Sequence, residues 1–486
     1  MWNSLNRSMM VCQMLFGLSY YGVMGILTPF FLELGYSEEH TLMILGAFSA
    51  IGPLFAVSGG FIADKFLGAY RALTISCIGF AAGYALLVLA AWVRNVPLAL
   101  CGIALASYFR GLMSPSYPSL YKRTFKTRED FENGIPVNYS VNNVGAFLGM
   151  YLFPALILKA GFQGGFLLSA LLAATALGTL LFMRHPLRGV AAPIDQAPVG
   201  VKNWIAFFAV SAAMIGLVFY MFSNMDVGQV IVYVIGGAAI LYFVSLMFRF
   251  GRAERFGMGA ILLMMFLTTC FYIYYGQIMT SLNIVAINTM RGDIFGVIPI
   301  APAASMSMNP LWCMVAGPVL AWVFSRMEKR GINWSTATKV GISFVLTAVA
   351  FGTMTLAVNA VGPDAAIRPE IFLVVHLFQA FAEVIVGALV VAFILSVTPR
   401  SIENFSVSMF SVAIALSGIV GAVFSTSIAQ EKGQAITQEI VRSVYGGYFG
   451  VLTVLAVVMV GVALAASWII RKMLAAARVA AESAEA

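Results

Sequence analysis

The chain has 486 residues, of which 61% are hydrophobic and only 10% are charged, and its net charge is +8. Soluble domains carry about 25% charged residues, so this composition excludes a soluble globular protein. The basic excess lies in loops that would face anionic lipid headgroups, so it gives no reason to expect a nucleic-acid partner. The five cysteines fall in apolar segments without paired spacing. We therefore expect neither a disulfide framework nor a metal site.

Apolar runs of roughly 18 or more residues recur along the chain, and each is long enough to cross a hydrocarbon core about 30 Å thick. The predicted spans lie near residues 11–34, 41–63, 72–93, 96–121, 136–158, 162–183, 203–223, 227–248, 256–290, 308–325, 335–360, 370–398, 404–428 and 443–470. These fourteen segments predict an all-α integral membrane protein.

A polar stretch with three prolines, 185–202, separates the first six spans from the remainder. We therefore predict an N-terminal six-helix bundle over 1–184 and a linker with two inserted helices over 185–254. A C-terminal six-helix bundle with a cytoplasmic tail follows over 255–486. Parallel six-helix halves of this kind describe the major facilitator architecture.

The positions of Lys and Arg give an independent test of this topology, because cytoplasmic loops collect basic residues. With the N-terminus inside, 21 of the 28 basic residues fall on the cytoplasmic side and 6 on the other. The remaining one, Arg110, lies within a span. Both termini are therefore predicted to be cytoplasmic.

The most specific loop signal is GGFIADKFLGAYRA at 59–72, between the second and third spans. It resembles the motif that major facilitators carry at this place, with Asp64, Lys65 and Arg71 at the matching positions. An acid and a base at a helix end can pair to hold one conformation, so these three residues are predicted to act as a gate.

Arg110 and Glu383 are the two charges left inside the predicted spans, where an ionisable group costs roughly 2.5–3.5 kcal/mol. Glu383 shares a helical face with His376 and Gln379. It is interpreted either as a proton carrier or as the partner of a substrate ammonium group. His376 is either its relay partner or a neutral, hydrogen-bonded residue. Arg110 is either an anchor for a substrate anion, a structural partner of Glu383, or a side chain that reaches the interface.

Four further segments resemble the proton-dependent oligopeptide transporter (POT/PTR) family of the same superfamily. They are LSYYGVMGIL at 18–27, the stretch 111–145, the pieces 277–283 with 309–310, and FAEVIVG at 381–387. The resemblance covers nearly the whole chain. It implies that substrate is bound at family positions held here by Tyr20, Tyr21, Asn143, Gln277, Asn309 and Glu383.

Several positions depart from the family pattern, which makes the chain an atypical member. The first-helix motif E-x-x-E-R, linked to proton coupling, is missing, as are two cations associated with the peptide carboxylate and one seventh-helix Glu. These positions hold Gln13, Phe16, Gly17, Met24, Ser114 and Gly276. Arg110 lies one helical turn before Ser114, so it could restore an anion anchor about 6 Å along the axis.

The leading hypothesis is a secondary active transporter that moves di- or tripeptides, or peptide-like zwitterions, by alternating access, with possible proton coupling through Glu383. The alternative is efflux or facilitated diffusion of another organic solute without standard proton coupling. An enzyme is not expected, because the sequence contains no H-E-x-x-H, G-x-S-x-G or Walker-type motif. We expect a monomer in a bacterial inner membrane whose partners are the substrate, protons and lipid, without a cofactor.

Overall fold

The computed structural model describes residues 3–190, 193–399 and 402–485, and almost all of these residues are helical. Within them, thirteen helical stretches are long and apolar enough to span a membrane. The chain divides into two compact units, residues 1–229 with 303–311 and residues 230–302 with 312–486.

The helices of the first part of the chain are α1 (Ser4–Glu33), α2 (Glu38–Ile62), α3 (Ala69–Val93), α4 (Val96–Arg123), α5 (Arg128–Phe182), α6 (Arg184–Val190), α7 (Pro193–Gln196) and α8 (Val201–Ser223), with a π-helical turn η1 (Ala63–Leu67) after α2. The α5 stretch is a single run of helix with a break at Gly161, where φ is +65°. Glycine adopts this backbone conformation without a steric penalty. The break lies between the fifth and sixth predicted spans, so α5, which counts as one of the thirteen stretches, contains both.

In the first unit, α1 packs along α5, and α4 lies between α2 and α3. Ser19 of α1 and Ser169 of α5 each donate a hydroxyl hydrogen bond to the other's carbonyl, at 2.9 and 3.1 Å. The inserted helix α8 also belongs to this unit. It packs on α4, where the hydroxyls of Tyr108 and Ser211 lie 2.7 Å apart.

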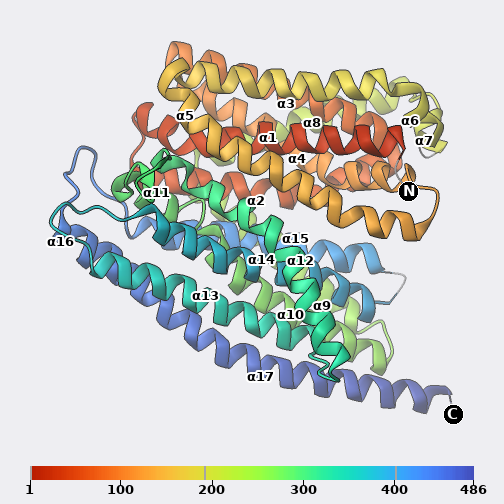
Figure 1. The fold of residues 1–486 in the computed structure, drawn as a ribbon. Coiled ribbons are helices and arrows are strands. Elements are labelled where there is room, and N and C mark those ends of the chain that lie inside the picture. The colour runs from red at the N-terminus through yellow and green to blue at the C-terminus, as the bar shows by residue number, and fades with distance from the viewer. Residues whose placement is uncertain (1–2, 191–192, 400–401, 486) are drawn as a thin grey trace. The chain divides into compact units, whose positions relative to one another are not determined.

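The helices of the second part are α9 (Met225–Met247), α10 (Arg252–Gly276), α11 (Ser281–Thr289), α12 (Met308–Lys329), α13 (Thr336–Asn359), α14 (Pro369–Val397), α15 (Glu403–Thr426), α16 (Gln438–Ile440) and α17 (Gly446–Glu485). The 3₁₀ turn η2 (Pro302–Ser307) precedes α12, and the π-helical turn η4 (Val441–Tyr445) precedes α17. The predicted span 256–290 is thus interrupted between α10 and α11. Figure 1 shows α13 running beside α17, and hydroxyl pairs at 2.9 Å join these two helices.

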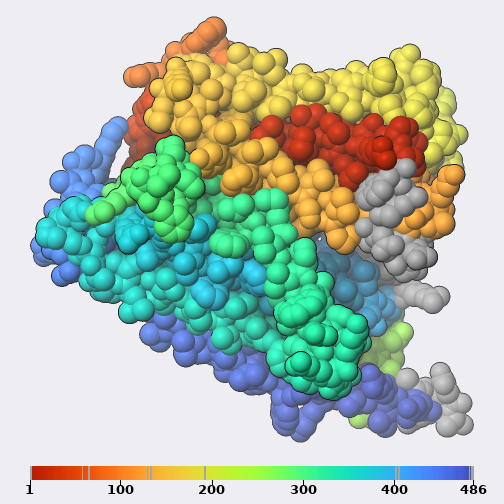
Figure 2. All heavy atoms as spheres, in the orientation of Figure 1, coloured from red at the N-terminus to blue at the C-terminus, as the bar shows by residue number. Residues whose placement is uncertain are grey.

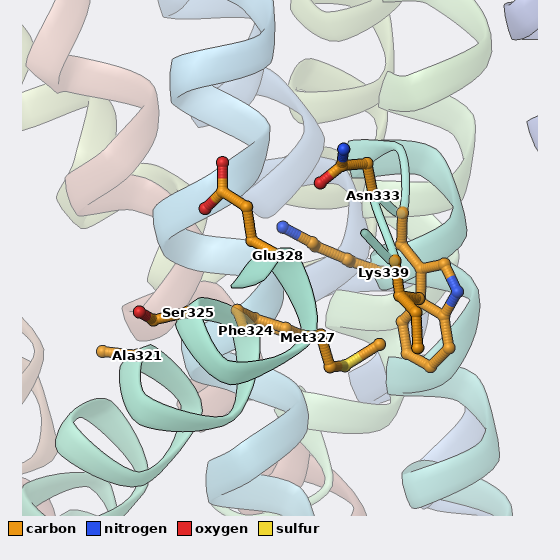
Figure 3. Close-up of a pocket in the computed structure, with 9 residues that line it drawn as sticks. Ala321, Phe324, Ser325, Met327, Glu328, Asn333 and Lys339 are labelled. Carbon is orange, nitrogen blue, oxygen red and sulfur yellow. The ribbon is translucent and has the colours of Figure 1, made fainter. Parts of the chain in front are cut away.

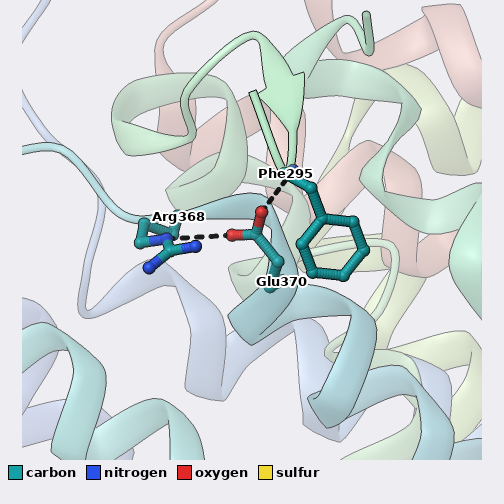
Figure 4. Close-up of polar contacts among 3 residues, drawn as sticks. All are labelled: Phe295, Arg368 and Glu370. Atoms are coloured by element: carbon teal, nitrogen blue, oxygen red, sulfur yellow. Dashed lines mark hydrogen bonds and ion pairs between the residues drawn. The ribbon is translucent and has the colours of Figure 1, made fainter. Parts of the chain in front are cut away.

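A short antiparallel hairpin, β1 (Asp293–Ile294) with β2 (Ile298–Pro299), follows α11. In the space-filling view this green segment lies at the surface (Figure 2), and Phe295 is 66% exposed. Figure 4 shows how the hairpin is held. Glu370, in the first turn of α14, accepts a hydrogen bond from the backbone N–H of Phe295 and another from Arg368 Nε at 3.1 Å. The hairpin is therefore fixed to the start of α14.

Candidate functional site

A cavity of about 270 Å³ lies within the first unit. Its walls come from α1, α4 and α5. The residues that line it are Gln13, Phe16, Gly17, Tyr21, Arg110, Met113, Ser114, Tyr117, Pro118, Asn138 and Asn142. Arg110 is the one charged side chain among these lining residues, so the cavity offers a cation without a carboxylate beside it.

The Arg110 guanidinium is held by two aromatic side chains of α1. Its Cζ atom lies 3.8 Å from the centre of the Tyr20 ring and 5.9 Å from that of Tyr21. The Tyr20 ring is fixed in turn by stacking on Phe48 of α2, with 5.4 Å between the ring centres. Cation–π contacts of this kind stabilise a desolvated guanidinium while leaving its N–H groups free to bind an anion.

Four positions at which the family pattern has a charge line this same cavity: Gln13, Phe16, Gly17 and Ser114. Gln13 Nε2 donates a hydrogen bond to Asn142 Oδ1 at 3.0 Å, which joins α1 to α5. The structure thus brings together the positions of the missing charges and the single cation that remains. Asn143 lies on α5, only 7% exposed, and its amide donates to the carbonyl of Tyr139 on the same helix.

In the second unit, Glu383 lies on α14 opposite a thiol. Cys313 of α12 donates a hydrogen bond from Sγ to Glu383 Oε2 at 3.3 Å. Tyr272 of α10 is close enough to interact electrostatically with both groups. Among the residues the structure describes, no three His, Cys, Asp or Glu side chains are grouped as metal ligands. The arrangement suits a carboxyl group that exchanges a proton or binds an ammonium.

Gln277 lies at the break between α10 and α11 and is fully buried. Its amide nitrogen donates to the carbonyls of Ile273 and Gly421, and its amide oxygen accepts from the hydroxyls of Ser281 and Tyr448. These bonds join α10 to α15 and α17 at the interruption. The Gln277 side chain therefore has a structural role here, whatever its role toward substrate.

His376 and Asn309 are buried, with 1% and 5% exposure. His376 lies two helical turns before Glu383, which separates them by roughly 10 Å along the α14 axis. This spacing requires an intervening group for any proton relay between them.

The predicted gate loop is held by hydrogen bonds to the linker around α7, which the sequence did not predict. The side chains of Asp64 and Lys65 lie outside the described part of the structure, but Arg71 donates to the carbonyls of Ile194 and Ala197 in and after α7. Asp195 of α7 is fully buried, and its Oδ1 accepts from the backbone N–H of Tyr70 at 2.9 Å. Burial raises the pKa of this carboxyl, although backbone hydrogen bonds oppose the shift.

We call the contact of α7 with η1 and the start of α3, formed by Asp195, Arg71 and Gly68, the linker strap. Gly68 has φ of +84°, and a Cβ atom placed on it would come 2.1 Å from Asp195 Oδ1. Only glycine fits, because both the backbone conformation and the space exclude a side chain. Sequence reasoning missed Asp195, although it is the single acidic residue among residues 184–225.

A second cavity, of about 520 Å³, lies between the end of α12 and the start of α13 in the second unit. Figure 3 shows Glu328, Asn333 and Lys339 turned toward one another at its edge. The Lys339 ammonium lies 4.4 Å from the centre of the Phe324 ring. In the predicted division into two six-helix bundles, this loop would hold the place in the second bundle that the gate loop holds in the first.

Comparison with known proteins places these features in context. The model of the POT family matches residues 70–441. The chain is 26% identical over 412 residues to dipeptide and tripeptide permease B of Salmonella typhimurium, covering 84% of each chain. It is 27% identical over 463 residues to the permease of the same name from Edwardsiella piscicida, covering 93% of this chain and 92% of the relative. A crystal structure of tetrameric PepTSo2 superimposes with a TM-score of 0.86 at 23% identity, covering 96% and 98% of the two chains.

Proposed function

The chain belongs to the POT family, and from this premise we propose that it moves di- and tripeptides, or similar zwitterions, across the membrane by alternating access with protons as the coupling ion. The two permeases that match the chain are named for dipeptides and tripeptides. The observation that carries the proposal is the cavity of the first unit, in which Arg110 is the single charged lining residue. A peptide carboxylate is the anion that this cation would bind.

We assign Arg110 to the carboxylate end of the substrate. A guanidinium held on an aromatic face keeps its charge and presents paired N–H donors that match a carboxylate. Tyr20 and Tyr21 position the guanidinium. Asn143, whose amide donates to the carbonyl of Tyr139 on α5, is proposed to bind substrate as well. The position of Arg110, one turn from Ser114, replaces the anchor that the family pattern puts at the latter residue.

We assign Glu383 to the coupled proton or to the ammonium end of the substrate. Its contacts in the second unit include the thiol of Cys313 and the nearby phenol of Tyr272. Gln277 and Asn309 are also proposed to bind substrate, and His376 is proposed to assist Glu383 through an intervening group. A thiol can donate to the ionised carboxyl and accept from the protonated one, which suits a group that loses and regains a proton.

We further propose that Asp64, Lys65 and Arg71 form a cytoplasmic gate and that both termini face the cytoplasm of a bacterial inner membrane. The three regions 1–184, 185–254 and 255–486 would then be the N-terminal bundle, the linker with its inserted helices, and the C-terminal bundle. One chain is proposed to be the transporting unit. The tetrameric relative offers the alternative assembly, and the mass of the purified protein in detergent distinguishes the two.

Uptake of a labelled dipeptide into proteoliposomes tests the proposal, with and without an imposed inward proton gradient. We expect accumulation above equilibrium only with the gradient, and competition by unlabelled di- and tripeptides but not by free amino acids. Failure of every peptide to compete would contradict the substrate class. Uptake that ignores the gradient would retain transport and refute proton coupling.

A further inference from the structure

Helix α12 is tied to α14 at two consecutive residues. Trp312 Nε1 donates to the carbonyl of Leu373 at 2.9 Å, and the Cys313 thiol donates to Glu383 Oε2 at 3.3 Å. Cys313 is only 1% exposed. The indole bond holds α12 to α14 at the residue next to Cys313, ten residues before Glu383 on α14, and so limits the movement of the thiol relative to that helix.

A thiol differs from most hydrogen-bonding side chains in being both a weak donor and a weak acceptor. It can donate to an ionised carboxylate and accept from a protonated one, at modest energetic cost in either state. A second titratable group near Glu383 is the Tyr272 phenol of α10.

We propose that Cys313 is a positioning residue for Glu383: its thiol holds the carboxyl in one orientation through both protonation states and sets the pH at which the proton is released. This rests on the proposed function of Glu383 as proton carrier. A cysteine at this position would thus tune the working pH range of the transporter.

Two substitutions with opposite expected effects test the assignment. Cys313→Ala removes the donor to the ionised form, so the midpoint of the pH profile of uptake should move upward by about half to one pH unit. Cys313→Ser provides a stronger donor, since O–H···O⁻ bonds are the shorter and stronger kind, so the midpoint should move downward. Cys270→Ala on α10 is the matched control and should leave the midpoint in place.

A merely structural role predicts a different result, in which both Cys313 variants lower the rate and neither moves the midpoint. That result, or midpoints equal to that of the parent protein, would overturn the proposal. Absence of peptide uptake by the parent protein at any pH would instead indicate that the proposed function is wrong.

An infrared titration gives a readout that does not depend on transport. The S–H stretching band of Cys313 should shift as the Glu383 carboxyl titrates, and the shift should be lost in both Cys313→Ala and Glu383→Gln. An S–H band that does not respond to the titration of Glu383 would refute the hydrogen bond on which the inference stands.

Discussion

Arg110 and Glu383 are the two charges that the sequence places inside predicted spans, and their surroundings differ in kind. Arg110 lies against the Tyr20 ring in a cavity whose described lining residues include no acid. Glu383 contacts a thiol and lies near a phenol, and neither of these groups carries a positive charge. The first environment favours a permanent charge, and the second tolerates a change of charge.

This difference suggests a division of work between the two units. A fixed cation binds substrate with the same strength over the working pH range. A carboxyl beside a thiol and a phenol can gain and lose a proton, so it provides the pH-dependent step of transport. The family pattern puts further charges in the first unit, at positions held here by Gln13, Phe16, Gly17 and Ser114. With those absent, the dependence on pH should fall on the second unit.

The largest effect is expected from Glu383→Gln, which keeps the shape of the side chain and removes its proton exchange. Accumulation driven by the proton gradient should fall at least about a hundredfold. Exchange of labelled for unlabelled peptide without a gradient should continue, because binding through Arg110 remains. Glu370→Gln on the same helix serves as a control, since that carboxylate holds the hairpin. Uptake driven by the proton gradient in the Glu383→Gln variant would show that Glu383 is not the group that responds to pH.

The next effect is expected from Arg110→Gln, which leaves the cavity without a cation. A charge-assisted hydrogen bond contributes about 1.5–3 kcal/mol, so peptide affinity should fall roughly 10- to 100-fold. The loss should be the same at every pH within the working range. Arg110→Lys keeps the charge without the paired donors and should recover only part of the affinity. A loss that varies with pH would assign a titrating role to the first unit.

A smaller effect is expected at Tyr20, whose ring lies over the guanidinium. Tyr20→Leu should weaken peptide binding about 2- to 30-fold, because a cation–π contact contributes about 0.5–2 kcal/mol. Tyr20→Phe keeps the ring and should bind peptide nearly as well as the parent protein. Equal losses in the two variants would show that the hydroxyl, and not the ring, is what matters. Competition between labelled and unlabelled dipeptide for the protein in detergent measures the affinity of both variants and of the parent protein.

Much of the fold could be predicted from the sequence, because each membrane span must satisfy its own backbone hydrogen bonds and therefore appears as a long apolar run. The break at Gly161 was placed correctly as a boundary between spans. The break at Gln277–Thr280 was not, because there Gln277 donates to the carbonyl of Gly421 and accepts from the hydroxyl of Tyr448, and both residues are distant in sequence.

The site was predicted less completely than the fold. Arg110 and Glu383 could be found because a charge in an apolar run is visible locally. Their partners could not, because the contact of Cys313 with Glu383 spans 70 residues and that of Asp195 with Tyr70 spans 125. Contacts of this length are set by helix packing, of which a single sequence carries no direct record.

The first unit does contain a buried acid, Asp195, which lies in the linker strap. It can be compared with Glu383, because its expected effect is on stability and not on transport. Asp195 caps the start of α3, so Asp195→Ala should lower the free energy of unfolding by about 0.5–2 kcal/mol. Asp195→Asn keeps an acceptor and removes the titration. Since burial raises the folded-state pKa above the ordinary value of 3.8, the folded protein binds this proton more readily than the unfolded chain does. The stabilisation is therefore fully present below pH 3.8 and is lost as the pH rises through the raised pKa.

Thermal unfolding midpoints over a pH series measure this effect, as the difference between the parent protein and Asp195→Asn. The difference should shrink as the pH rises through that window, whereas Asp226→Asn, at an exposed position on α9, should show no such trend. Peptide uptake should keep the pH midpoint of the parent protein, because Asp195 does not line the Arg110 cavity. A shifted uptake midpoint in Asp195→Asn would instead make the strap a second proton-sensitive element and would end the assignment of pH dependence to the second unit alone.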